Sequence, residues 1–286
     1  TEVEVKTASR HLSADAGFRL GHELSLSRPA SARLTLTPAG YDALMDASSA
    51  ASEGAAAAAG YALAEDATFD AQVSTLRWPL TGKFDPSRAA VAATAKTPLL
   101  SLRDRASGQS IAIETFELKL EGRDLSKPVD IEINGRIRDS AKEEATSGDA
   151  AGRIGVSGQA ADVFSPEGQL NVDGLSLRLE GGLQEIPTAL LDELLGGGDM
   201  LVATLGKTTD VSVDADVQRM TGPVSLRLRS DNATANVVSQ LGMDGLVLTE
   251  PLVAEVQVTR AFGKLVLGKI HPIFETAQSS ERAVRF

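Results

Sequence analysis

Three histidines, His11, His22 and His271, are the residues of this chain best suited to act as acids or bases or to bind a metal. None of them has a second histidine or a carboxylate at the spacing of a metal-binding pair. His271 precedes Pro272 near the end of an expected helix, where a hydrogen-bonded structural role is the ordinary one. His22 follows the apolar phase of an expected strand and could line a cavity or lie exposed. The histidines therefore predict no catalytic site and no metal site.

Two glycine-containing segments could serve phosphate binding or nucleophilic catalysis, but neither has the required spacing. Gly206-Lys207-Thr208 resembles the end of a phosphate-binding loop, yet Leu201 stands where that loop needs glycine, and a strand pattern follows instead of a helix. Gly155-Val-Ser-Gly158 lacks the glycine spacing of a nucleophile elbow. The pair Glu143-Glu144 lies in a charged loop, where solvation is expected. We therefore expect no enzyme activity and no cofactor.

The composition excludes further classes. The chain has 286 residues and no cysteine, which removes disulfide scaffolds and thiol enzymes. It carries 28 Lys and Arg against 39 Asp and Glu, a net charge of -11 without a basic cluster, so nucleic acid is not an expected partner. The long uncharged stretch from Ala55 to Ala64 is mostly alanine and glycine, which does not predict a membrane span.

The elements that position the remaining side chains are predicted mainly as strands. Apolar residues alternate with polar ones along most of the chain, which is typical of antiparallel sheet with one wet face. Turns are expected at Asp173-Gly174, Gly181-Gly182, Asp231-Asn232 and Asp244-Gly245. A change of phase between Ile113 and Phe116 predicts a bulge.

Three short amphipathic helices are expected, beginning at Thr37-Pro38, at Ile186-Pro187 and at Thr259. They are too few to cover the apolar side of so many strands. Two folds would solve this: a β-sandwich that buries two sheets against each other, or a strongly curved antiparallel sheet forming an open hydrophobic groove. Composition alone favours the sandwich. The 4% aromatic content and the bulge and glycine signals favour the groove, which we take as the prediction with the sandwich as the alternative.

Two segments resemble units of the AsmA-like superfamily, the bacterial envelope proteins that include TamB and YhdP. One is the run from Pro251 to Phe274, a strand entering a capped helix that ends in Ile-His-Pro-Ile-Phe. The other is Ile186-Pro-Thr-Ala-Leu-Leu-Asp-Glu-Leu-Leu195, followed by Leu205-Gly206 and an alternating strand. The resemblance covers the last 120 residues or so and reaches the first 140 only through the strand pattern and the Thr37-Pro38 helix.

The resemblance implies a long β-groove protein that lets phospholipid acyl chains slide between the inner and outer membranes. It implies a periplasmic location in a Gram-negative bacterium and an inner-membrane anchor outside this sequence. We therefore expect residues 1–286 to be a fragment of a longer repetitive protein, with possible sub-modules 1–140 and 150–286 and an alanine-rich insertion at 47–64. The alternative is a structural or assembly scaffold of the envelope that recruits protein partners and has no lipid conduit.

The expected lipid-binding wall consists of aliphatic residues that share the apolar phase of their strands, although each could equally be ordinary core. These residues are Leu118, Leu120, Ile131, Ile133, Leu175, Leu177, Leu179, Val211, Val213, Val224, Leu226, Leu228, Val256 and Val258.

Overall fold

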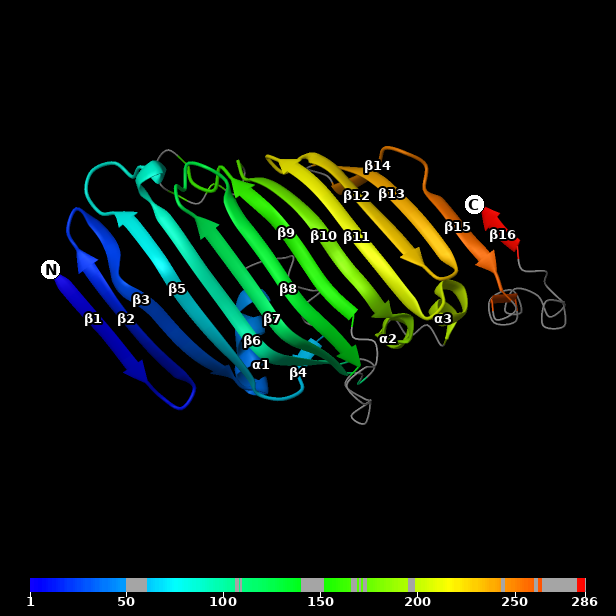
Figure 1. Cartoon of the computed structure of the whole chain (residues 1–286), viewed down its shortest axis with the longest axis horizontal. Helices are drawn as coiled ribbons and strands as arrows, with labels where there is room; N and C mark the ends of the chain where they lie inside the picture. The colour runs from blue at the N-terminus through cyan, green and yellow to red at the C-terminus, as the bar shows by residue number, and fades with distance from the viewer. Residues whose placement is uncertain are drawn as a thin grey trace.

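The chain forms one large, open, antiparallel β-sheet with three short α-helices, seen in the computed structural model of Figure 1. The structure describes residues 1–49, 61–105, 108, 110–139, 152–165, 169, 171, 174–194, 199–242, 245–259, 262–263 and 282–285. The predicted mainly-β fold is confirmed. All strands in the described part of the chain belong to this one sheet, so the alternative sandwich of two sheets is wrong.

The strands and helices follow one another along the chain with mostly short connections. The strands are β1 (Glu2–Ala8), β2 (Leu12–Leu20), β3 (Glu23–Leu36), β4 (Tyr61–Leu63), β5 (Ala67–Pro79), β6 (Ala90–Asp104), β7 (Ser110–Gly122), β8 (Val129–Asp139), β9 (Gly152–Ala161), β10 (Ser176–Pro187), β11 (Thr208–Gln218), β12 (Gly222–Ser230), β13 (Ala233–Gly242), β14 (Gly245–Leu248), β15 (Val253–Val258) and β16 (Arg282–Arg285). The helices are α1 (Pro38–Ser49), the 3-10 helix η2 (Pro86–Arg88), α2 (Thr188–Leu194) and α3 (Met200–Leu205).

Neighbours in the sheet are almost always neighbours in sequence, as in a meander. The order is β1-β2-β3-β5-β6-β7-β8-β9-β10-β11-β12-β13-β15-β16, with β4 added beside β6 and β14 beside β13. β1 and β16 are the outermost strands and lie at opposite ends of the molecule (Figure 1). β8 and β9 pair from Val129 to Ile137, so the expected boundary between residues 140 and 150 falls within a continuous sheet.

Several sequence predictions for local structure hold. The phase change before Phe116 is a bulge in which Thr115 has φ 51°, and the register between β7 and β8 shifts there. The turn at Asp231-Asn232 joins β12 to β13. Thr37 caps α1, because its Oγ1 accepts a hydrogen bond of 3.1 Å from the Gly40 N–H.

Other local predictions are wrong. Gly181 and Gly182 do not form a turn but lie in the middle of β10. The helix expected from Ile186 begins at Thr188, because Ile186 and Pro187 still pair with β11. The residues from Met200 to Leu205, for which the sequence pattern predicted no helix, form α3. His22, expected on a strand, lies instead in the turn between β2 and β3, where it is exposed.

The remaining predictions fall partly or wholly outside the described residues. Thr259 accepts a hydrogen bond of 3.1 Å from the Phe262 N–H, as expected at a helix start, but residues 264–281 are outside that range, His271 among them. The described residues also exclude 50–60 of the alanine-rich segment. They exclude 140–151 as well, which include Glu143-Glu144.

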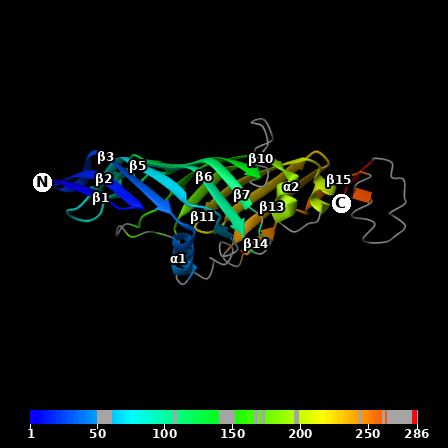
Figure 2. The ribbon, with the colours of Figure 1, turned by 90° about the horizontal axis from the view of Figure 1, so that it is seen from below.

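Different elements lie at the two ends of the strands. At one end, Trp78, Phe84 and Phe164 form an aromatic cluster with ring centroids 4.7 to 5.5 Å apart, packed with a small core of Ala89, Leu125 and Val129. At the other end lie α1, α2 and α3, along the lower margin of the sheet in Figure 1. Figure 2 shows α1 projecting from the underside of the ribbon. Between these ends the sheet is one layer thick.

Candidate functional site

The strand registers gather the predicted aliphatic residues into rows that cross the sheet. Residues directly opposite each other in an antiparallel pair share a face, so each chain of paired positions traces one row. The central row runs Leu118, Ile133, Val156, Gly181, Val213, Leu226 and Val237, from β7 to β13. It contains four of the predicted wall residues, each on a different strand.

Two further rows flank the central row on the same face. One runs Leu120, Ile131, Gly158, Leu179, Ala215, Val224 and Ser239. The other runs Gly135, Ile154, Leu183, Val211, Leu228, Ala235 and Ala254. The three rows together form a band made mainly of Leu, Ile and Val, here called the aliphatic face. At ~4.8 Å per strand, seven strands make this band about 30 Å long.

The other predicted wall residues lie around this band. Leu177 pairs with Ala160 and Val217 in a fourth row, close to the small aromatic core. Leu175 precedes the first residue of β10, and its carbonyl accepts a hydrogen bond from the Arg219 N–H. Val256 pairs with Ala233 near the margin where the helices lie, and Val258 pairs with Arg282 of β16.

The exposure of the predicted wall residues shows that none of them is fully buried against the other described residues. Thirteen of them are half-buried, and Leu226 is 38% exposed. Residues that face a second sheet would be almost fully buried. The buried apolar residues of the described chain are instead mostly small or lie near the two ends of the strands, as Ala89, Leu125, Ile186 and Leu190 do.

The same face continues onto strands outside the predicted wall. The central row extends from Leu118 through Ala95, Ala71, Ala32 and Ala14 to Thr7 of β1. Ile154, Val156 and Leu183 are further members that the sequence prediction missed. The sequence signal for these positions is alternation with a period of two. Ala14 and Ala16 flank one polar residue, and Ile154 and Val156 flank one glycine. This signal is weak in β2 because alanine marks the apolar phase less clearly than Leu, Ile or Val, and in β9 because Gly155 and Gly158 place glycine in both phases.

The opposite face of the sheet carries the charges. Arg33 pairs with Asp70 at 2.6 Å, Lys96 with Glu117 at 2.9 Å, and Lys119 with Glu132 at 3.2 Å. A hydrogen bond from Arg28 lowers the pKa of Asp15, and one from Lys96 lowers the pKa of Glu117. These pairs are solvent-exposed, where such interactions contribute little to stability.

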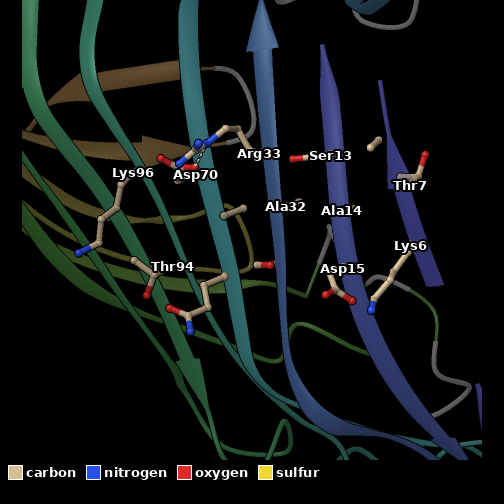
Figure 3. A pocket seen from close by; sticks show the side chains of 14 residues that line it. Lys6, Thr7, Ser13, Ala14, Asp15, Ala32, Arg33, Asp70, Thr94 and Lys96 are labelled. Carbon is tan, nitrogen blue, oxygen red and sulfur yellow. Dashed lines mark hydrogen bonds and ion pairs between the residues drawn. The ribbon is translucent and has the colours of Figure 1, made fainter. Parts of the chain in front are cut away.

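A cavity of about 810 Å³ lies on this charged face, over β1 to β6. Figure 3 shows Lys6 and Lys96 on opposite sides of it and Arg33 close to Asp70. Its lining includes the hydroxyl groups of Ser13, Ser31 and Thr94. None of the predicted wall residues lines it, but Thr7, Ala14, Ala32 and Ala71, which extend the central row, also contribute to its lining.

The described residues hold no side-chain cluster suited to a metal ion. No group of three or more His, Asp or Glu side chains among them could hold a metal ion. Within the same residues, no helix is long and apolar enough to cross a membrane. The aliphatic face is thus the arrangement with the clearest capacity to bind something, and it can bind only through apolar contact.

Comparison with known proteins adds no assignment, because no protein-family model, no curated protein and no solved structure matches the chain.

Proposed function

We propose that the aliphatic face binds the acyl chains of phospholipids and that the protein acts as a non-enzymatic segment of a lipid conduit in the bacterial envelope. The observation that carries this proposal is the band of three adjacent aliphatic rows, in register over seven strands and mostly half-buried. The resemblance to AsmA-like envelope proteins supports the same function and suggests a periplasmic location, with an inner-membrane anchor outside this sequence.

An aliphatic band that stays exposed to water has an unfavourable hydration free energy. Apolar surface left wet costs about 25 cal/mol per Å², and patches beyond a few hundred Å² on a single protein usually mark a binding surface. A hydrocarbon chain can cover the band without hydrogen-bonding to it. From β7 to β13 the band is also chemically similar from strand to strand, because most of these strands offer Leu, Ile, Val or Ala at the same level. Dispersion contacts are non-directional, so an acyl chain can move along such a surface without breaking a specific bond.

The first test is whether phospholipid accompanies the purified protein and depends on the aliphatic face. Lipid is extracted from detergent-free protein and quantified by mass spectrometry for the wild type and for Leu226→Asp. Leu226 is the most exposed predicted wall residue, so the charge should be tolerated by the fold while disrupting a bound acyl chain. We expect bound phospholipid in the wild type and at least a several-fold loss in the variant.

Ser212→Asp is the matched control, because Ser212 is exposed on the charged face and pairs with Arg227. This variant should retain wild-type lipid. Far-UV circular dichroism and thermal melting of all three proteins separate loss of lipid from loss of fold. Absence of phospholipid from the wild type, or equal lipid in Leu226→Asp and Ser212→Asp, would contradict the proposal.

A further inference from the structure

The outer edge of β1 has no partner among the described residues. β1 pairs with β2 on its inner side only, and all seven of its residues are exposed. An edge of this kind presents a row of unpaired backbone N–H and C=O groups, onto which another strand can add. β1 is a regular strand of ordinary length, so within the described residues this edge offers seven positions for pairing.

The hydrogen bonds to β2 identify the backbone groups that point outward. Thr1 and Leu20 exchange both backbone hydrogen bonds, at 2.9 and 2.7 Å. At the other end of this hairpin, the Ser9 N–H donates to the Leu12 carbonyl. Bonding alternates along an antiparallel strand, so the odd-numbered residues bond to β2 and the even-numbered ones face outward. The free groups therefore belong to Glu2, Glu4, Lys6 and Ala8.

The side chains of β1 make this edge complementary to itself. Glu4 and Lys6 lie on the charged face; neither is within ion-pair distance of an opposite charge among the described residues, although Lys6 attracts Asp15 and Glu4 attracts Arg28 at longer range. If two β1 strands pair antiparallel about Val5, Glu4 lies opposite Lys6 of the other copy, and Lys6 lies opposite Glu4. Val5 meets Val5 on the aliphatic face, and all seven residues are paired.

The neighbouring registers of the β1–β1 pair are less favourable electrostatically. Pairing centred on Glu4 places two glutamates opposite each other, and pairing centred on Lys6 places two lysines opposite each other, and like charges at such positions destabilise a sheet. Centring on Val5 also places even-numbered residues opposite even-numbered residues, as the outward-pointing groups require.

We propose that two copies of this chain associate through β1 to form a two-fold symmetric dimer with one continuous sheet. A two-fold axis perpendicular to the sheet reverses the strand direction and preserves the faces. The aliphatic faces of both copies therefore lie on the same side and meet at Val3 and Val5, which are 36% and 45% exposed in the single chain. The pairing itself does not depend on the proposed lipid function. Because seven residue pairs make a small interface, the dimer is expected to be weak and concentration-dependent.

Sedimentation equilibrium over a wide concentration range tests the dimer by charge reversal. Glu4→Lys places two lysine pairs across the interface, Lys6→Glu places two glutamate pairs there, and each should weaken dimerisation about tenfold or more. The double variant Glu4→Lys with Lys6→Glu restores opposite charges in the same register and should restore the dimer. An equal mixture of the two single variants should form a heterodimer at concentrations where each alone is monomeric.

Glu65→Lys is the matched control, because Glu65 is exposed between β4 and β5 and the net charge changes equally. It should dimerise like the wild type. Thermal melting shows that each variant is folded, and Glu4→Lys should retain its lipid, so that failure of the dimer and failure of the lipid proposal are distinguishable. The proposal would be overturned if the wild-type chain stays monomeric, or if neither single variant weakens the dimer. It would also be overturned if the dimer is lost only when β16 is removed.

Discussion

Two adjacent glycines set the path of β10 across the aliphatic face. Gly181 and Gly182 have φ values of 149° and 156°, a conformation that side chains rarely permit. A Cβ on Gly181 would overlap the Gly155 carbonyl oxygen, and one on Gly182 would overlap the Val211 carbonyl oxygen. Glycine is required here by close approach of neighbouring strands. The sequence alone suggested a turn, because paired glycines are also the usual residues of a tight hairpin.

This close approach predicts a sharp difference between neighbouring glycines. Gly181→Ala should destabilise the fold by about 2 kcal/mol, because a strained backbone and a steric overlap are added together. A Cβ on Gly155, in the adjacent strand, would meet nothing within 4 Å, so Gly155→Ala should change stability by less than ~0.5 kcal/mol. Urea unfolding of both variants measures the difference, and equal stabilities would contradict the close packing of β9 on β10.

On the charged face, the Lys96–Glu117 pair predicts a pH effect with a defined sign. The hydrogen bond from Lys96 lowers the pKa of Glu117. A carboxyl group whose pKa is lower in the folded state stabilises the fold above its unfolded pKa, and this contribution is lost as the pH falls through the folded pKa. Lys96→Met should therefore raise the pKa of Glu117 towards its ordinary value, with Lys119 still providing part of the effect. An NMR titration of the Glu117 carboxyl carbon measures it, and an unchanged pKa would refute the pairing.

At the scale of elements, α2 and α3 form a corner that depends on one buried carboxylate. Asp192 of α2 is 3% exposed and accepts a hydrogen bond of 2.6 Å from the Leu201 N–H at the start of α3. Asp199, the residue directly before α3, makes no capping hydrogen bond with its side chain. A residue of the preceding helix thus takes the capping role.

Removing this carboxylate should loosen α3. Asp192→Ala leaves the Leu201 N–H without its acceptor in a partly buried place and should cost about 1–3 kcal/mol. Asp199→Asn keeps a residue that tolerates the left-handed backbone at that position, where φ is 67°, and should be nearly neutral. Hydrogen exchange of the α3 amides, with thermal melting, distinguishes the two, and equal protection in both variants would contradict the assignment.

The elements that could be predicted from sequence are those specified by local pattern. Alternation identified most strands, the bulge near Thr115 and the cap at Thr37, because each depends on residues close in sequence. The start of α3 was not predicted, since its Leu201 N–H is satisfied by Asp192, nine residues earlier. Alternation also assigned the wall residues to one phase, but whether that phase faces a second sheet or solvent depends on packing between distant parts of the chain.

Across the whole molecule, the aliphatic face changes character along its length. From β2 to β6 its central row is alanine, and from β7 to β13 it is mainly Leu, Ile and Val. Short side chains leave more room above the sheet and offer less apolar area per strand. In the β1-paired dimer, the two alanine portions would lie at the centre and the two bulky portions at the outer ends.

Site-specific photocrosslinking can determine whether acyl chains lie on the aliphatic face. A photoreactive amino acid is placed at Val213 or at Ser212, adjacent residues on opposite faces of β11. Each protein is irradiated with vesicles of a radiolabelled phospholipid. We predict strong lipid labelling from position 213 and background labelling from position 212. Equal labelling from the two positions, or labelling from position 212 alone, would show that the aliphatic face is not where lipid binds.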